Sequence, residues 1–239
     1  MGSRFIYFCR TACLASPAKG SNSDGTYLPE SEPCHPDAAS FAAEDLCTLL
    51  IALIIGLIVL LGAHVFVTFR GAREQAIEQL GQGGYRILFT LVSLAGLVFL
   101  VWGYGEYRAH EWLQIWTPPS YMRHVTEGLM LFAVIFISAA YIPSHIKAWL
   151  KHPMLASVKT WALAHLLSNG DLGSIVLFGA FLAWGVYARI AAKRRGDLGF
   201  RTPPAGWTND VIVVVLSAVI YFLLGYYFHP YVIGVRVFG

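Results

Sequence analysis

Residues 46–69 read LCTLLIALIIGLIVLLGAHVFVTF, an apolar run in which the one histidine is His64. At 1.5 Å per residue, a helix over this run can cross a hydrocarbon layer about 30 Å thick. Four more runs of similar character follow, at residues 87–105, 125–142, 172–188 and 211–228. None of them alternates apolar and polar residues as membrane barrel strands do, so each run is predicted to be a helix.

The composition also indicates a membrane protein. Of the 239 residues, 56% are hydrophobic and 13% are charged, whereas an average soluble domain carries about 25% charged residues. The net charge of +3 is too small to suggest a nucleic-acid surface. All four cysteines precede residue 50, so neither a disulfide framework nor a thiolate metal site is expected in the main body. We therefore expect a polytopic protein whose main partner is the lipid bilayer.

Residues 1–45 differ in composition from the rest of the chain. The stretch 16–40 is rich in Ser, Pro, Gly, Asp and Glu and poor in large apolar residues, which is typical of disorder. We predict two parts, a disordered or dispensable extension at 1–45 and a transmembrane domain at 46–239.

A shorter and more polar helix is predicted over residues 153–168. Proline is favoured at the first helical position, where Pro153 would lie, and Asn169-Gly170 is typical of a helix end. Asp171 is expected to cap the helix that follows. Sixteen residues would span only about 24 Å, so this element is either a thin crossing inside the bundle or a re-entrant piece.

The distribution of Lys and Arg favours six crossings. If all six elements cross, the loops after the first, third and fifth carry ten Lys and Arg residues, and the opposite face carries three. Both termini would then lie on the non-cytoplasmic side. The expected fold is all-α, a polytopic membrane helix bundle of about six transmembrane helices with the fourth one short. In a bacterium it would reside in the cytoplasmic membrane.

Three ionisable side chains fall inside these elements, namely His64, Lys159 and His165. Such residues are costly in a membrane and are functional candidates by default. His64 is either a packing histidine hydrogen-bonded to a neighbouring backbone or hydroxyl group, or a residue with a ligand or catalytic role. Lys159 is either a functional group or a side chain that reaches the interface. Two neutral imidazoles on different helices would suit a haem. No nucleophile elbow, phosphate-binding glycine loop or zinc-protease motif is present.

Four further histidines have simpler interpretations. His124 precedes Glu127 by three residues on the third predicted span, so the two side chains are expected to pair. His145 and His152 are expected at a solvated basic edge, and His229 is expected at the interface where the last span ends.

The sequence resembles the NnrU family. The resemblance rests on HPMLASVKTWALAHLLSNGD at 152–171 and LFGAFLAWGVYARIAAKRR at 177–195. It rests also on LLGAH at 60–64, YRILFTLVSLAGL at 85–97 and PPSYMRHVTEGLMLFAVIFISAAYIP at 118–143. It covers about residues 46–235. One departure is that the family commonly places an arginine soon after the first-span histidine, whereas here the next arginine is Arg70.

The resemblance implies an integral membrane protein associated in some bacteria with nitrite and nitric oxide reduction. The chain is also similar to the plant and cyanobacterial zeta-carotene isomerase, a membrane haem b enzyme that isomerises a cis double bond without net redox change. Two functions follow as expectations: a haem b protein that isomerises a carotenoid or other apolar substrate, or a non-catalytic component that supports denitrification.

By its motifs, the resemblance assigns the haem ligands to His64 and His165, with His152 as the next candidate. Depth in the membrane favours a different pair. His64 would lie about 10 Å to the cytoplasmic side of its helix midpoint, and His165 about 7 Å to the outer side of its own. A gap of about 17 Å is large for one iron, whereas His152 lies at the same end as His64.

Overall fold

In the computed structural model, the described residues are 36–109, 113–204 and 206–238, with side chains described from Leu50 onward. The chain divides into two units, residues 1–49 and 50–239, and the structure presented below is that of the second unit. Most of the predicted extension at 1–45, including Cys9, Cys13 and Cys34, lies outside the described residues. Its last ten residues, 36–45, belong to the first helix.

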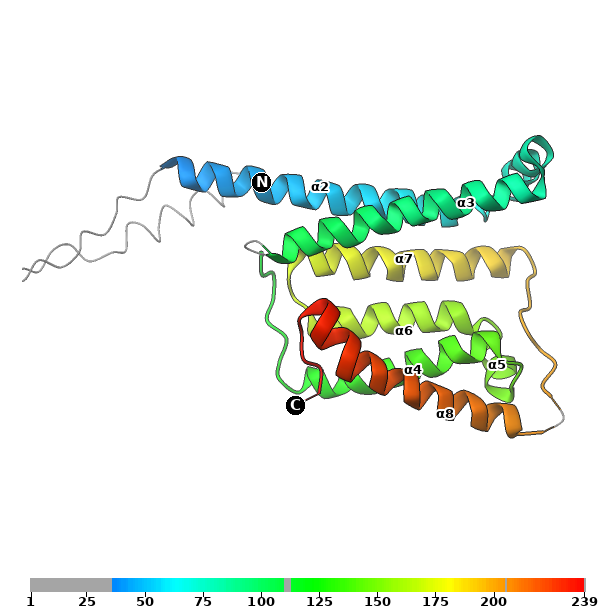
Figure 1. Cartoon of the computed structure of the whole chain (residues 1–239). Coiled ribbons are helices and arrows are strands. Elements are labelled where there is room, and N and C mark those ends of the chain that lie inside the picture. Colours follow the sequence, from blue (N-terminus) through cyan, green and yellow to red (C-terminus); the bar gives the residue numbers. More distant parts are fainter. Residues whose placement is uncertain (1–35, 110–112, 205, 239) are drawn as a thin grey trace, which may run out of the picture. The chain divides into compact units, whose positions relative to one another are not determined.

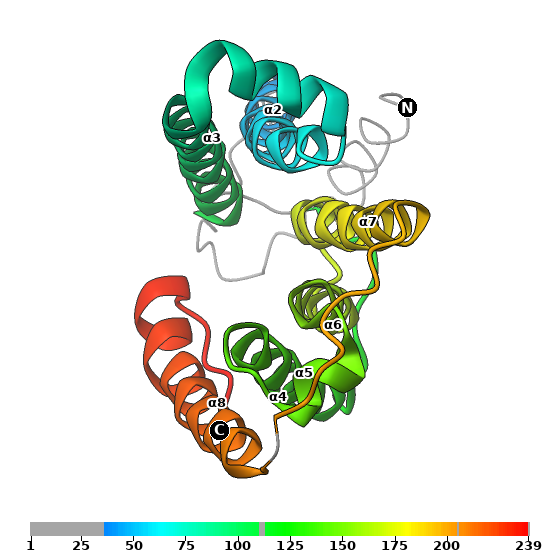
Figure 2. The same ribbon diagram turned by 90° about the vertical axis from the view of Figure 1, so that its right-hand side faces the viewer.

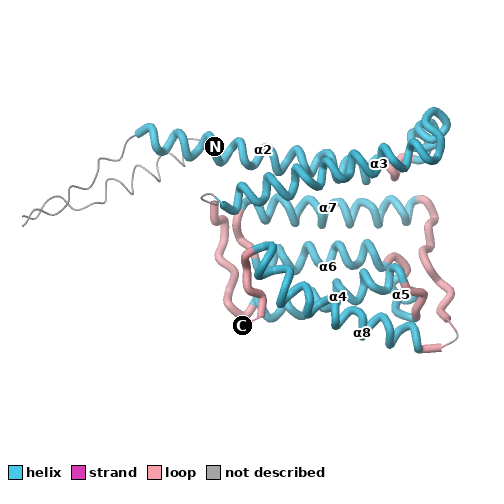
Figure 3. The backbone as a smooth tube through the Cα atoms, in the orientation of Figure 1, coloured by secondary structure: helices cyan, strands magenta, loops and turns pink. Residues whose placement is uncertain are grey.

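The second unit is built from helices, as Figures 1 and 3 show. Apart from an isolated bridge between Gln114 and Asp171, no strand pairing occurs in the described ranges. The predicted all-α fold is confirmed. The helices are α2 (Pro36–Phe66), α3 (Arg70–Ala109), α4 (Met122–Tyr141), α5 (His145–Leu150), α6 (Pro153–Ser168), α7 (Leu172–Arg194), α8 (Thr208–Leu223) and the π-helix η1 (Leu224–Ile233).

Local sequence signals set several of the boundaries. Helix α6 has the predicted bounds, with Pro153 in its first turn and Asn169 as its C-cap. Asp171 caps α7 as predicted, because its Oδ1 accepts a hydrogen bond of 2.9 Å from the backbone N–H of Ser174. Helix α3 begins well before the predicted span at residue 87, and a non-helical residue, Gly81 (φ 70°, ψ 161°), separates its two segments.

Helices α3, α6 and α7 lie with their axes roughly aligned, and α8 runs obliquely to them (Figure 1). Viewed end on, α4, α6 and α7 follow one another, α8 lies beside α4, and α2 and α3 lie beyond α7 (Figure 2). The six-residue helix α5, which was not predicted, connects the end of α4 to the start of α6.

The bundle has the polarity expected of a membrane protein. Four described helices are long and apolar enough to cross a membrane. They are Arg70–Ala109, Met122–Tyr141, Leu172–Arg194 and Thr208–Ile233. The apolar part of α2, Leu50–Phe66, is shorter. The surface of α8 is apolar, with Val215 and Phe222 more than half exposed, whereas the buried side contains Ser217. An apolar exterior around small polar interior residues suits lipid. Crossing by α2 and α6 stays a prediction.

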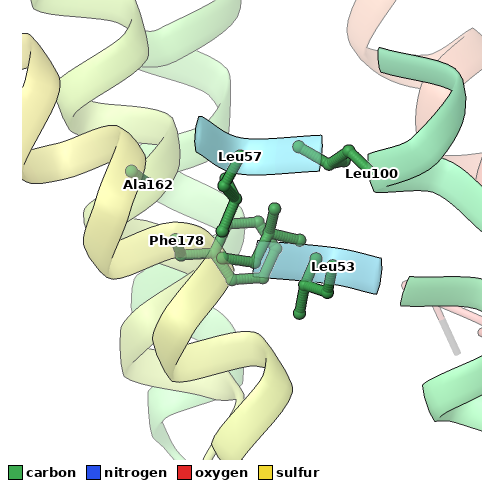
Figure 4. Packing of buried hydrophobic residues seen from close by; sticks show 6 residues of the cluster. Leu53, Leu57, Leu100, Ala162 and Phe178 are labelled. Atoms are coloured by element: carbon green, nitrogen blue, oxygen red, sulfur yellow. The ribbon is translucent and has the colours of Figure 1, made fainter. Parts of the chain in front are cut away.

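A small apolar core joins four helices (Figure 4). Leu53 and Leu57 of α2 meet Leu100 of α3 and, from the other side, Ala162 of α6 and Phe178 of α7. All five side chains are at most 7% exposed. This core fixes α2 and α3 against the α6–α7 pair.

Glycines allow α2 and α3 to approach at backbone distance. A Cβ added to Gly96 would lie 2.6 Å from the backbone N of Leu60, and one added to Gly103 would lie 2.5 Å from that of Leu53. Gly56 of α2 is in reciprocal contact with the backbone of Leu100. Close contacts of this kind bring dispersion and packing energy to helix association in lipid, where no hydrophobic effect drives it.

We predict that Gly103→Ala destabilises the bundle by about 1–3 kcal/mol, because the added methyl group meets backbone atoms that cannot move aside. The measurement is thermal unfolding of the detergent-solubilised protein. Gly105→Ala is the matched control, since a Cβ there meets no atom within 4 Å. Equal melting temperatures for the two variants would contradict this account of α2–α3 packing.

Candidate functional site

A cavity of about 1050 Å³ lies among the described helices α3, α4, α6, α7, α8 and η1. Sites for small molecules and cofactors usually measure about 300–1,000 Å³, so this cavity is at the large end of the range. Its walls are mostly apolar, and polar and charged groups gather toward one end. The members used below are Arg108, Arg123, Met130, Ile137, Trp161, His165, Phe178, Tyr221, His229, Arg236 and Phe238.

His165 reaches this cavity from the last turn of α6. Its Nδ1 lies 2.9 Å from the carbonyl oxygen of Trp161, one turn earlier. The imidazole ring stacks on Phe178 of α7, with a centroid separation of 4.5 Å. The ring is thus held by its own helix on one side and by an aromatic face on the other.

His229 reaches the same cavity from the π-helix η1. Its Nδ1 lies 2.9 Å from the carbonyl oxygen of Leu224, five residues earlier. Pro230 follows within η1 and lacks an N–H, so it cannot continue an α-helical ladder. The rings of His165 and His229 lie 6.4 Å apart between centroids and are inclined by 21°. The structure therefore brings together two histidines that are 64 residues apart in the sequence.

The hydrogen bonds define the tautomer of each neutral ring. A carbonyl oxygen can only accept, so Nδ1 must carry the proton in both His165 and His229. The lone pair of each ring is then on Nε2. A ring whose Nδ1–H is fixed by a carbonyl and whose Nε2 is unprotonated is the usual form of a metal-binding histidine.

Arginines line the end of the cavity near this pair. Arg108, Arg123 and Arg236 come from α3, α4 and the tail after η1. Arg123 donates from Nε to Glu127 Oε1 at 3.1 Å and from Nη2 to the carbonyl oxygen of Val237 at 2.6 Å. The guanidinium group therefore holds the tail residues against the bundle, where they form part of the cavity wall.

The sequence-predicted ligand His64 lies elsewhere. Its ring neighbours are Phe89 of α3, at 5.3 Å, and Trp184 of α7, at 5.6 Å. Its Nδ1 lies 2.8 Å from the carbonyl oxygen of Leu60, as the packing interpretation expects. On α7, His64 contacts Trp184 and His165 contacts Phe178. These two contact points are six residues apart, or about 9 Å along the helix. The structure does not place His64 beside His165.

The remaining predicted residues of α6 also lie away from the pair. His152 is the N-cap of α6, thirteen residues or about 20 Å from His165, and its Nε2 lies 3.3 Å from the carbonyl oxygen of Asp197. The Lys159 side chain lies across Gly185 of α7, where an added Cβ would meet its Cγ at 2.8 Å.

Two other histidine predictions have different outcomes. The His124–Glu127 pair is confirmed, with Nδ1 and Oε2 3.4 Å apart. His145 is only partly exposed, at 27%, because its ring stacks on Trp207 at 4.0 Å and its Nδ1 lies 2.8 Å from Asp210 Oδ2. This contact ties α5 to α8, and only the fold reveals it.

Comparison with known proteins identifies the family. The family described as NnrU protein matches residues 52–237, which is most of the chain and includes every lining residue of the cavity except Phe238. The chain belongs to the NnrU family. No curated protein and no solved structure matches it.

In this NnrU family member, the candidate site differs from the one that the motifs indicate. His165 is present as expected, and its structural neighbour is His229. From the sequence, His229 is expected at the interface where the last span ends, whereas the helix continues as η1 to Ile233. The sequence signal for His229 was a histidine followed by proline in an apolar run. Its position beside His165 depends on how α8 packs against α4 and α6.

For this NnrU protein we predict that Arg123→Ala releases the tail from the cavity wall. Hydrogen bonds to a charged group contribute about 1.5–3 kcal/mol, and exposure of the Arg123 side chain reduces this to roughly 1 kcal/mol. Amide hydrogen exchange at residues 235–238 should then be about fivefold faster. His124→Ala is the control, because the His124 ring is 81% exposed and contacts Glu127 rather than the tail. Unchanged exchange in Arg123→Ala would show that other contacts fix the tail.

Proposed function

We propose that this integral membrane protein of the NnrU family binds haem b in the 1050 Å³ cavity, where His165 and His229 would hold it. The observation that carries the proposal is the pair of rings 6.4 Å apart, each with its Nδ1 on a backbone carbonyl. The lone pair of each ring is on Nε2, and a metal–nitrogen bond is about 2 Å long. The short distance between the two rings supports one bound group held by both.

The donor set favours haem over a bare metal ion. Within the described residues, no three His, Cys, Asp or Glu side chains gather as a metal site. A porphyrin supplies four nitrogen ligands of its own, so it needs only one or two from the protein. Two histidines in an apolar cavity are enough for haem and too few for a closed zinc site.

The charged end of the cavity suits the rest of the cofactor. Haem carries two carboxylates on one edge of a largely apolar ring. Arg108, Arg123 and Arg236 line the same cavity as the histidine pair, and guanidinium groups bind carboxylates strongly. The apolar walls around Phe178 and Met130 would exclude water from the ring.

Bound haem would supply a redox-active iron. The protein's own residues would do three things. The carbonyl oxygens of Trp161 and Leu224 would hold the two imidazoles in the ligating tautomer. Phe178 would fix the orientation of the His165 ring, and the apolar walls would keep the site dry. Such a site would suit either electron transfer or catalysis at the iron.

The length of the cavity favours an apolar substrate as a second ligand. Its lining follows α4 from Arg123 to Ile137, fourteen residues or about 21 Å. On this ground we place an isomerase acting on a carotenoid-like polyene first, in agreement with the family resemblance. The alternative is a haem-carrying component that supports nitrite or nitric oxide reduction without turnover of its own.

The first test is the visible spectrum of the full chain purified in detergent, oxidised and reduced with dithionite. We predict a Soret band that shifts on reduction, and a loss of haem occupancy of at least about tenfold in His165→Ala and in His229→Ala, because each removes one of the two residues that would hold the haem. His64→Ala and His152→Ala are the matched controls and should retain haem.

The outcomes separate the alternatives. A colourless protein after haem-supplemented expression would overturn the proposal. Haem loss in His64→Ala with full occupancy in His229→Ala would instead support the pair that the motifs indicate. With haem established, conversion of a cis-carotene to its isomer by the wild-type protein and not by His165→Ala would support the isomerase, and no conversion would favour the denitrification component.

A further inference from the structure

A second cavity, of about 300 Å³, lies where α6 begins and is lined by basic residues. Lys147, Lys151 and His152 line it together with apolar side chains, among them Phe200 from the loop between α7 and α8. No carboxylate is among its lining residues. The basic side chains in its lining therefore suit an anion. This cavity is separate from the histidine pair, which lies at the other end of α6.

The backbone of Lys151 is in a conformation that lysine rarely adopts. Its φ is 64°, the one positive φ among the described residues other than glycine. A position in the left-handed region normally selects glycine or asparagine, because the Cβ of other residues is strained there. Residues in such conformations gather at functional sites. Local folding would favour glycine at 151, so Lys151 is a candidate functional residue.

The cavity wall is built from two distant segments that are bonded together. The N–H of Phe200 donates to the carbonyl oxygen of Lys151 at 3.0 Å, and the Nε2 of His152 donates to the carbonyl oxygen of Asp197 at 3.3 Å. Gly199 (φ 67°) lies so close that an added Cβ would be 2.9 Å from that same Nε2. These contacts fix the α7–α8 loop over the start of α6.

The ammonium group of Lys147 is held in place at this wall. The Nζ of Lys147 donates to the carbonyl oxygen of Ala140 at 2.7 Å and lies 5.0 Å from the centre of the Phe200 ring. An ammonium group has three N–H donors, so further donors remain for a ligand. Helix α6 begins at Pro153 without a side-chain cap, which adds the positive end of its dipole to the same cavity.

We propose that this cavity, formed by Lys147, Lys151, His152 and Phe200, binds a phosphate-type oxyanion. Two lysines at the start of a helix offer charge-assisted hydrogen bonds to its oxygens. Met154 lines the cavity and is 45% exposed, and Trp149, two residues before Lys151, is 78% exposed. Exposed apolar side chains beside a basic pocket suit the headgroup of an anionic lipid, and free phosphate shares the same chemistry.

The test uses the full chain purified in detergent and Lys151→Gly. This substitution removes the cation and relieves the strained backbone, so the variant should melt no lower than the wild type. Native mass spectrometry would follow binding of short-chain phosphatidylglycerol, phosphatidylcholine and inorganic phosphate. We expect the wild type to prefer phosphatidylglycerol over phosphatidylcholine, and Lys151→Gly to bind it about fivefold more weakly.

Lys193→Ala is the matched control. It removes one positive charge from the exposed last turn of α7, outside the cavity lining, and should bind phosphatidylglycerol as the wild type does. Inorganic phosphate that binds with the same dependence on Lys151 would identify the free anion as the ligand. Equal binding by Lys151→Gly and Lys193→Ala in both arms would overturn the proposal.

Discussion

Inside a bilayer, a polar atom must find its hydrogen-bond partner within the protein, because no water is available there. The histidines of this bundle meet that demand locally. His64, His165 and His229 each direct Nδ1 to a carbonyl oxygen of their own helix, four or five residues earlier. The bond that makes burial tolerable also leaves Nε2 of each ring unprotonated. One hydrogen bond therefore satisfies the polar ring inside the protein and leaves a lone pair on its Nε2.

The same demand connects the helices to one another. Thr126 of α4 donates to the carbonyl oxygen of Ala164 at 3.0 Å, and Ser157 of α6 donates to that of Ala133 at 2.7 Å. These hydroxyl groups join α4 and α6 in the region of the cavity. Such bonds are individually modest in membranes, but here they fix the helix that carries His165.

Much of the fold could be predicted from the sequence because a membrane-spanning helix needs a run of about 20 mostly apolar residues. The bounds of α6 follow from the Pro153 start and the Asn169 end, and the Asp171 cap follows from the same local chemistry. The candidate site was predicted less well. His165 was expected, but its proximity to His229 depends on packing among α4, α6 and α8, which periodicity in one sequence does not encode.

The other departures have similar physical reasons. A single apolar window measures only the membrane-buried part of a helix, so the polar beginning of α3 before Gly81 was missed. The position of His145 follows from a contact between residues far apart in sequence, Asp210 and Trp207. The π-helical continuation after α8 arises where Pro230 interrupts regular α-helical bonding.

The walls of the large cavity come from segments spread between Leu97 and Phe238. During synthesis the ribosome delivers these segments in order, and the tail that Arg123 holds is the last of them. The cavity therefore has its complete lining only once residue 238 has been synthesised. A group that contacts the tail can be held by all of these walls only after that point.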